Sequence, residues 1–160
     1  MVLDMLNKLV DGVVDAVLAI SLAVISCITF AEVISRYFLH FSIPWSMDVI
    51  RIAFVYCVLF GAVAGVRDKA HLNIDVFLVM LSPKARRWAD IIIDICVGCF
   101  FLALVVLGKN FVGSAGTQAM PYTLVPMRYL YVGVPMAGLL MLYYLVQQLW
   151  AKLTTTSVEG

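Results

Sequence analysis

The stretch EVISRYFLHFSIPWSMDVIR, residues 32–51, joins the end of one apolar segment to the start of the next. It carries four charged side chains, Glu32, Arg36, Asp48 and Arg51, around a short Ser-Ile-Pro-Trp turn. In the whole chain of 160 residues, 64% are hydrophobic and only 13% are charged. Because a soluble domain usually has about 25% charged residues, this composition indicates an integral membrane protein.

Four apolar segments are each long enough to cross a membrane. Each is close to the roughly 20 residues that cover about 30 Å of hydrocarbon as a helix. A helix satisfies its own backbone hydrogen bonds in lipid, so we predict an all-α membrane protein. We expect one four-span domain over residues 1–160, with spans at about 12–31, 49–66, 91–107 and 129–150.

The basic residues are unevenly distributed among the loops. Residues 67–87 hold five of them, whereas each of the other two loops holds one or two. Cytoplasmic loops carry an excess of Lys and Arg. We therefore predict that this loop faces the cytoplasm, and four spans then place both termini there as well.

The same loop contains LNIDVFLVML, residues 72–81. This piece is too short to span, so we expect a short helix lying in the membrane interface. Lys84, Arg86 and Arg87 follow it and can reach lipid phosphates. Trp88 marks the start of the third span.

The turn in the opening stretch carries signals for the start of a helix. Pro44 suits the first turn of the second helix, because a proline there loses no needed N–H. Ser42 can cap that helix, and Trp45 suits the aromatic belt at the membrane interface. We therefore expect a tight hairpin between the first two spans.

The four charges flank this hairpin at about the same depth. Glu32 and Arg36 are four residues apart in the order that favours an ion pair on one helix face. Asp48 and Arg51 lie near the start of the next helix. We expect a linked ion-pair network, in which the cross-pairs Glu32–Arg51 and Asp48–Arg36 are possible. Two roles stay open, which are fixing the hairpin and presenting a charged surface to a partner.

Small residues and a polar loop complete the pattern. Cys57, Gly61 and Gly65 lie on one ridge of the second span, where small residues let another helix approach closely. Residues 113–128, between the last two spans, are rich in Gly, Pro and small polar residues. We expect this loop to be extended and exposed.

Single features of the sequence also suit two other functions. Cys96 and Cys99 form a CxxC that is typical of thiol oxidoreductases, but both lie inside a span, which favours a packing role. Glu32 suits a small multidrug antiporter, but Arg36 one turn away favours a paired structural acid. The sequence has no catalytic triad, phosphate loop or metal-ligand cluster, and its net charge is +1. We therefore expect no enzyme, no metal and no nucleic-acid partner.

The stretch from Glu32 to Arg87 resembles the small membrane subunit of the tripartite ATP-independent periplasmic (TRAP) transporters. That family has E-x-x-x-R-Y near the end of the first span and S-x-P-W-[ST]-x-[DE]-x-x-R at the start of the second. A basic residue and H-[IL]-x-[IV]-D follow. The matching residues are Glu32, Arg36, Tyr37, Ser42, Pro44, Trp45, Ser46, Asp48, Arg51, Gly61, Arg67, His71, Leu72, Ile74, Asp75, Pro83 and Arg87. Asp48 stands where glutamate is more usual, which keeps the charge.

This resemblance implies a scaffold role in the bacterial inner membrane. A periplasmic substrate-binding protein would deliver an organic anion, such as a C4-dicarboxylate or a sialic acid, to a large membrane subunit. The large subunit would hold the sodium that drives transport, and this chain would need no cofactor. The small subunit would stabilise the large one within the phospholipid bilayer and help to dock the binding protein.

Overall fold

The computed structural model describes residues 2–68, 83–115 and 117–156. Its secondary structure there is helical, apart from an isolated bridge between Ala119 and Pro126. The helices are α1 (Val2–Phe38), α2 (Pro44–Arg67), α4 (Pro83–Ala115), α5 (Arg128–Tyr131) and α6 (Gly133–Thr156). The all-α prediction is therefore confirmed.

Four stretches of these helices are long and apolar enough to cross a membrane. They are Met5–Phe38, Pro44–Arg67, Ile92–Ala115 and Arg128–Trp150. The helices extend beyond the predicted spans, since apolar runs mark only the part in hydrocarbon and a helix continues through polar flanks. The interfacial helix expected at residues 72–81 lies outside the described residues, together with His71 and Asp75. Lys84, Arg86, Arg87 and Trp88 fall within the first turns of α4.

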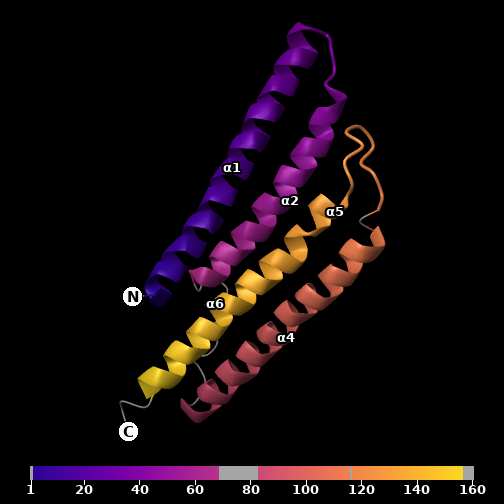
Figure 1. Ribbon diagram of the computed structural model, residues 1–160. Helices are drawn as coiled ribbons and strands as arrows, with labels where there is room; N and C mark the ends of the chain where they lie inside the picture. The colour runs from indigo at the N-terminus through magenta and orange to yellow at the C-terminus, as the bar shows by residue number, and fades with distance from the viewer. Residues whose placement is uncertain (1, 69–82, 116, 157–160) are drawn as a thin grey trace.

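The helices lie side by side in a single layer in the order α1, α2, α6, α4 (Figure 1). The last helix of the chain thus lies between the second span and the third. A small hydrophobic core runs along the seams and includes Val14, Phe60, Val63 and Tyr144. Many other apolar side chains point away from the layer, as Phe54 does, with 58% of its surface exposed. Such exposure suits helices that face lipid or another membrane protein.

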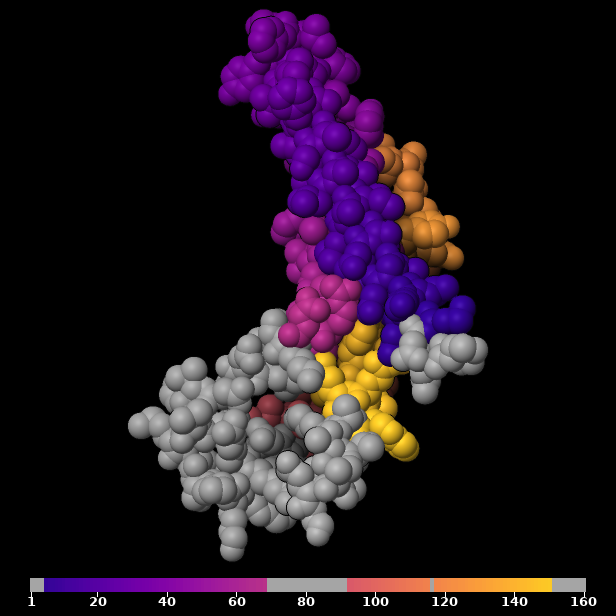
Figure 2. All heavy atoms as spheres, turned by 90° about the vertical axis from the view of Figure 1, so that its left-hand side faces the viewer, coloured from indigo at the N-terminus to yellow at the C-terminus, as the bar shows by residue number. Residues whose placement is uncertain are grey.

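The layer has two ends, which we name by what lies there. The hairpin end contains the α1–α2 turn and the connection between α4 and α5 (Figure 1). The terminus end contains the start of α1, the last turn of α2, the start of α4 and the end of α6. Figures 1 and 2 show that the α1–α2 hairpin reaches beyond the α4–α5 connection. One side of the layer therefore projects further at the hairpin end.

Close helix packing occurs at different glycines from those expected. A Cβ on Gly61 would meet only Leu18, at an ordinary 3.8 Å, so close approach is not what requires a glycine there. A Cβ on Gly108 would lie 3.1 Å from Pro135 Cδ, and one on Gly138 would lie 3.0 Å from Val105 Cγ2. These two contacts lie between α4 and α6, and a Cβ on Gly133 of α6 would likewise lie 3.1 Å from Leu59 Cδ1 of α2. The predicted ridge lies on α2, where Cys57 is only partly buried.

Candidate functional site

The α1–α2 turn is fixed by Ser35. Its carbonyl accepts hydrogen bonds from the N–H groups of Leu39 and Phe41, at 3.1 and 3.2 Å. Its hydroxyl donates to the carbonyl of Phe41 at 2.8 Å. His40 between them takes a φ of 52°, a left-handed conformation that lets the chain reverse. Ser35 is buried, so this turn is an ordered structure rather than a loose linker.

Helix α2 begins at Pro44, as predicted, with the proline in its first turn. The residue before the helix is Ile43, and no side chain caps the free N–H groups. The expected cap by Ser42 is therefore wrong, because Ser42 lies one residue too early. Trp45 exposes about half of its surface. This exposure is compatible with the predicted place of Trp45 in the aromatic belt.

Glu32 is held by two neighbours. Arg36, one turn further along α1, lies 3.6 Å away and forms the predicted ion pair. The Ser46 hydroxyl on α2 lies 2.8 Å from Glu32 Oε2 and 2.7 Å from the carbonyl oxygen of Ile43, and its one hydrogen can be donated to either acceptor. The Glu32 side chain is only 15% exposed, whereas that of Arg36 is 65% exposed. The contact across the two helices is therefore made by a neutral serine, which the sequence analysis did not identify.

Asp48 points toward the α4–α5 connection. Its Oδ2 accepts hydrogen bonds from the backbone N–H groups of Tyr122 and Thr123, at 3.0 and 2.8 Å. The Thr123 hydroxyl donates to the same oxygen at 3.0 Å. Asp48 is fully buried, and its Oδ1 has no hydrogen-bond partner among the described residues. This carboxylate joins α2 to a loop that is distant in sequence.

That loop is more ordered than the sequence suggested. Met120 is fully buried, and its N–H donates to the carbonyl of Val125 at 2.9 Å. The N–H of Met127 donates to the carbonyl of Gln118 at 2.7 Å. The expectation of an extended loop is wrong, because these cross-loop bonds and Asp48 supply partners for its backbone. The expected exposure holds for most of its side chains, such as Tyr122 and Leu124, and Met120 is the exception.

The expected network of four charges is also wrong in the isolated chain. Glu32 pairs within its own helix and with Ser46, while Asp48 is occupied by the loop. Arg51 is exposed and forms no ion pair with any residue that the structure describes. Equal depth on neighbouring helices brought the four residues to one end, but it did not decide which way each side chain points.

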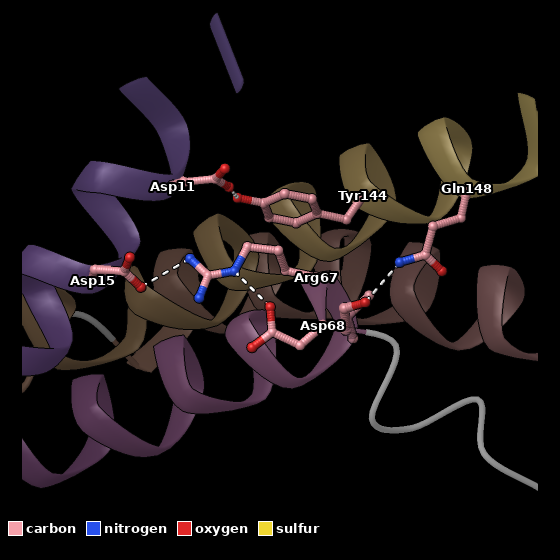
Figure 3. A network of polar contacts seen from close by, with 7 residues as sticks. Asp11, Asp15, Arg67, Asp68, Tyr144 and Gln148 are labelled. Carbon is pink, nitrogen blue, oxygen red and sulfur yellow. Dashed lines mark hydrogen bonds and ion pairs between the residues drawn. The ribbon is translucent and has the colours of Figure 1, made fainter. Parts of the chain in front are cut away.

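A second polar cluster, the terminus-end cluster, joins α1, α2 and α6 (Figure 3). Arg67 forms ion pairs with Asp15 on α1 at 2.8 Å and with Asp68 at 3.0 Å. Tyr144 on α6 donates to Asp11 on α1 at 2.6 Å. From the sequence, Arg67 was interpreted only as part of a basic loop. The structure shows that it ties two helices together.

Further hydrogen bonds extend this cluster along α6. The Gln148 amide donates to the carbonyl of Val66, the last buried residue of α2, at 2.7 Å (Figure 3). The Tyr143 hydroxyl and the Gln147 amide both donate to Asn7 Oδ1, each at 2.6 Å. These polar residues were not identified as a group from sequence, because their positions are more than 80 residues apart.

The two alternative functions find little support in the geometry. Cys96 and Cys99 are free thiols and exposed on α4. Glu32 already has two partners, so it does not match the unpaired acid of an antiporter. Within the described residues no group of three or more His, Cys, Asp or Glu side chains could hold a metal ion.

Four apolar helices with polar ties at both ends define a multi-pass membrane protein. The family model of the DctQ component of tripartite ATP-independent periplasmic transporters matches residues 25–155. The chain therefore belongs to the DctQ family, the small membrane subunits of TRAP transporters. The motifs in the opening stretch had indicated the same family.

Three relatives illustrate the similarity. A putative TRAP transporter small permease protein of Haemophilus influenzae is 28% identical over 125 residues, which cover 78% of this chain and 76% of the relative. The C4-dicarboxylate TRAP transporter small permease protein DctQ of Rhodobacter capsulatus is 31% identical over 109 residues, 66% of this chain and 48% of the relative. The sialic acid TRAP transporter permease protein SiaT of H. influenzae is 21% identical over 120 residues, 75% of this chain but only 20% of the relative. This chain thus spans about half the length of the DctQ relative and one fifth of SiaT.

Proposed function

We propose that this chain is the non-catalytic scaffold subunit of a sodium-driven, binding-protein-dependent transporter for an organic acid. The R. capsulatus relative is named for C4-dicarboxylates and SiaT for sialic acid. Both are carboxylates, so a carboxylate is the expected substrate class here. Sodium would bind to the large membrane subunit rather than to this chain.

The observation that carries this proposal is the single-layer arrangement of the helices. Transport sites lie near the middle of the membrane between broken helices and polar groups. Most polar ties of the described residues lie instead at the two ends of the layer, apart from the bond of the Tyr56 hydroxyl to the Tyr129 carbonyl. The groove between α4 and α6 is lined by apolar residues. A thin layer with two broad apolar faces is suited to packing against another membrane protein and enlarging it.

The match to SiaT supports a large permease as that partner. This chain corresponds to one fifth of SiaT, so that relative carries a similar segment together with a much larger remainder. Because the similar segment and the remainder of SiaT belong to one chain, they stay close to each other in space. We infer that the remainder of SiaT corresponds to a separate large subunit that packs against this chain.

The orientation follows from the basic loop. We propose that the terminus end is cytoplasmic, with Lys84, Arg86 and Arg87 near lipid phosphates, and that the hairpin end faces the periplasm. Arg36 and Arg51 are exposed at the hairpin end, where the periplasmic binding protein would dock.

A single cysteine at Ser42, in a chain without its four native cysteines, should react with an impermeant reagent outside intact cells. One at Thr156 should not, and labelling of Thr156→Cys would refute the orientation.

Reconstitution tests the scaffold role directly. Proteoliposomes that contain this chain, the large permease and the binding protein should take up a labelled carboxylate when sodium is supplied outside. Proteoliposomes with this chain alone should show no uptake, and those without it should lose uptake or lose the large permease during preparation. Carboxylate uptake by this chain alone would overturn the proposal.

A further inference from the structure

An apolar groove lies where α4 faces α5 and the start of α6, near the hairpin end. It has a volume of about 450 Å³, within the range of small-molecule binding sites. Its walls are formed mainly by Phe100, Leu104, Leu107 and Phe111 of α4 and by Tyr131 and Val134 opposite. The groove lies within the span Ile92–Ala115, so its open side would face the hydrocarbon of a bilayer.

The groove lies beside a close contact between α4 and the start of α6. Gly108 brings α4 so close to Pro135 that an added Cβ would lie 3.1 Å from it. Beside this contact, Phe111 and Tyr131 meet edge to face, with their ring centroids 4.6 Å apart. Leu107 and Phe100 have 66% and 60% of their surfaces exposed. The result is a channel lined by apolar side chains that the described residues leave unfilled.

A cation stands at the end of the groove. Arg128, the first residue of α5, lies three positions before Tyr131 and so shares a helix face with it. Arg128 is exposed and makes no ion pair with another described residue. It begins the span Arg128–Trp150, which places its guanidinium at the level of lipid headgroups. An apolar channel below an exposed cation matches the chemistry of a phospholipid, which has an acyl chain below a phosphate.

We propose that this groove binds one acyl chain of an anionic phospholipid, whose phosphate is held by Arg128. A transmembrane helix is about 10–12 Å across with its side chains, so a segment alongside Phe100 to Phe111 would occupy more than roughly 1,000 Å³, which exceeds the 450 Å³ of the groove. An acyl chain is thin and flexible enough to follow the channel between Leu104 and Tyr131. The guanidinium can donate two parallel hydrogen bonds to a phosphate, which favours the phosphate over uncharged lipid groups.

Quenching by brominated lipids tests the proposal on the complete chain, purified with its large permease. Trp45, Trp88 and Trp150 are replaced by phenylalanine, and the quenching of this background complex is subtracted from that of the same complex with Phe111→Trp, which places a reporter at the groove. Titration with phosphatidylglycerol brominated on its acyl chains should quench this reporter with saturation at low lipid fraction. Arg128→Gln should weaken binding by about fivefold, since a basic residue near a lipid surface contributes roughly 1 kcal/mol. Brominated phosphatidylethanolamine should bind more weakly than phosphatidylglycerol.

Matched variants separate a specific site from general contact with lipid. Ala103→Phe fills the groove and should abolish saturable quenching, while Ala19→Phe on an exposed face of α1 should leave it unchanged. Arg51→Gln, which removes another exposed arginine from the hairpin end, should also have no effect. Quenching that is unsaturable and equal in all variants would overturn the proposal. So would loss of the large permease from Ala103→Phe with lipid quenching intact, because the groove would then take a partner helix.

Discussion

The two ends of the helix layer use charge in opposite ways. At the hairpin end, the buried carboxylate of Asp48 accepts hydrogen bonds from neutral donors in the α4–α5 connection. At the terminus end, Arg67 pairs with two acids whose side chains are 59% and 63% exposed, Asp15 and Asp68. A buried group that loses its partners is costly, whereas exposed ion pairs contribute little. We therefore expect stability to depend far more on Asp48 than on the ion pairs of Arg67.

The difference also shows how a layer with a small core is held together. Helices in lipid gain no hydrophobic driving force from packing against each other, so close contacts and polar bonds carry more of the association. Asp48 connects the α1–α2 pair to the loop of the α4–α6 pair. The terminus-end cluster connects α1 to α6, as in the bond from Tyr144 to Asp11. Each end thus joins parts of the layer that are not consecutive in the chain.

The largest effect is expected from Asp48→Ala. It leaves the N–H groups of Tyr122 and Thr123 without their acceptor and releases the loop that buries Met120. The melting temperature in mild detergent, followed by intrinsic fluorescence, should fall by roughly 5 °C or more. The melting temperature of Asp48→Asn should fall less, because the amide oxygen of asparagine can still accept hydrogen bonds from these N–H groups. The control is Asp15→Ala at the terminus end, and an equal fall for that variant would contradict the comparison.

The middle of the layer gives the next largest effect. Gly138→Ala places a Cβ 3.0 Å from Val105 Cγ2 and 3.3 Å from the carbonyl oxygen of Phe101. Overpacking of this kind costs about 1–3 kcal/mol, so α4 and α6 should separate or shift. Gly61→Ala is the matched control, since its Cβ would meet Leu18 at 3.8 Å. Urea or heat titration of both variants should show a loss for Gly138→Ala alone.

A smaller effect is expected where Glu32 meets α2. Ser46→Ala removes the hydroxyl that donates to Glu32 Oε2, and a hydrogen bond to a charged group is worth about 1.5–3 kcal/mol. The loss should be smaller than this, because the one hydroxyl hydrogen is shared with the Ile43 carbonyl and because Glu32 stays beside Arg36. Ser42→Ala should be neutral, since Ser42 caps no helix. A loss of stability in Ser42→Ala that matched the loss in Ser46→Ala would show that the turn as a whole, rather than this bond, is responsible.

The sequence predicted what depends on short spacing. Four apolar runs, a proline that starts α2 and the pair of Glu32 with Arg36 all follow from positions a few residues apart. The family could also be identified, because its motifs lie within the same stretch. These features are local, so rules for a single helix or turn are sufficient.

The contacts that hold the helices of the layer together could not be predicted from local spacing. The partners of Asp48 lie 74 and 75 residues later, and the acceptor of Tyr144 lies 133 residues earlier. No periodicity relates such positions, because the neighbour order of the helices differs from their order in the chain. The wrong assignments of the four-charge network and of the extended loop have this one cause.

The smallest effect is expected at the terminus end and tests the other side of the comparison. Arg67 and Asp15 lie 2.8 Å apart, but 59% of the Asp15 side chain is exposed, and Asp68 offers Arg67 a second acid. A double-mutant cycle with Arg67→Gln and Asp15→Asn should give a coupling energy of about 0.2–1 kcal/mol. The coupling should weaken further in 0.5 M salt, because exposed charges are screened. A coupling energy well above this range, unchanged by salt, would mean that partner subunits or lipid bury the pair. The two ends would then contribute alike to the stability of the assembled protein.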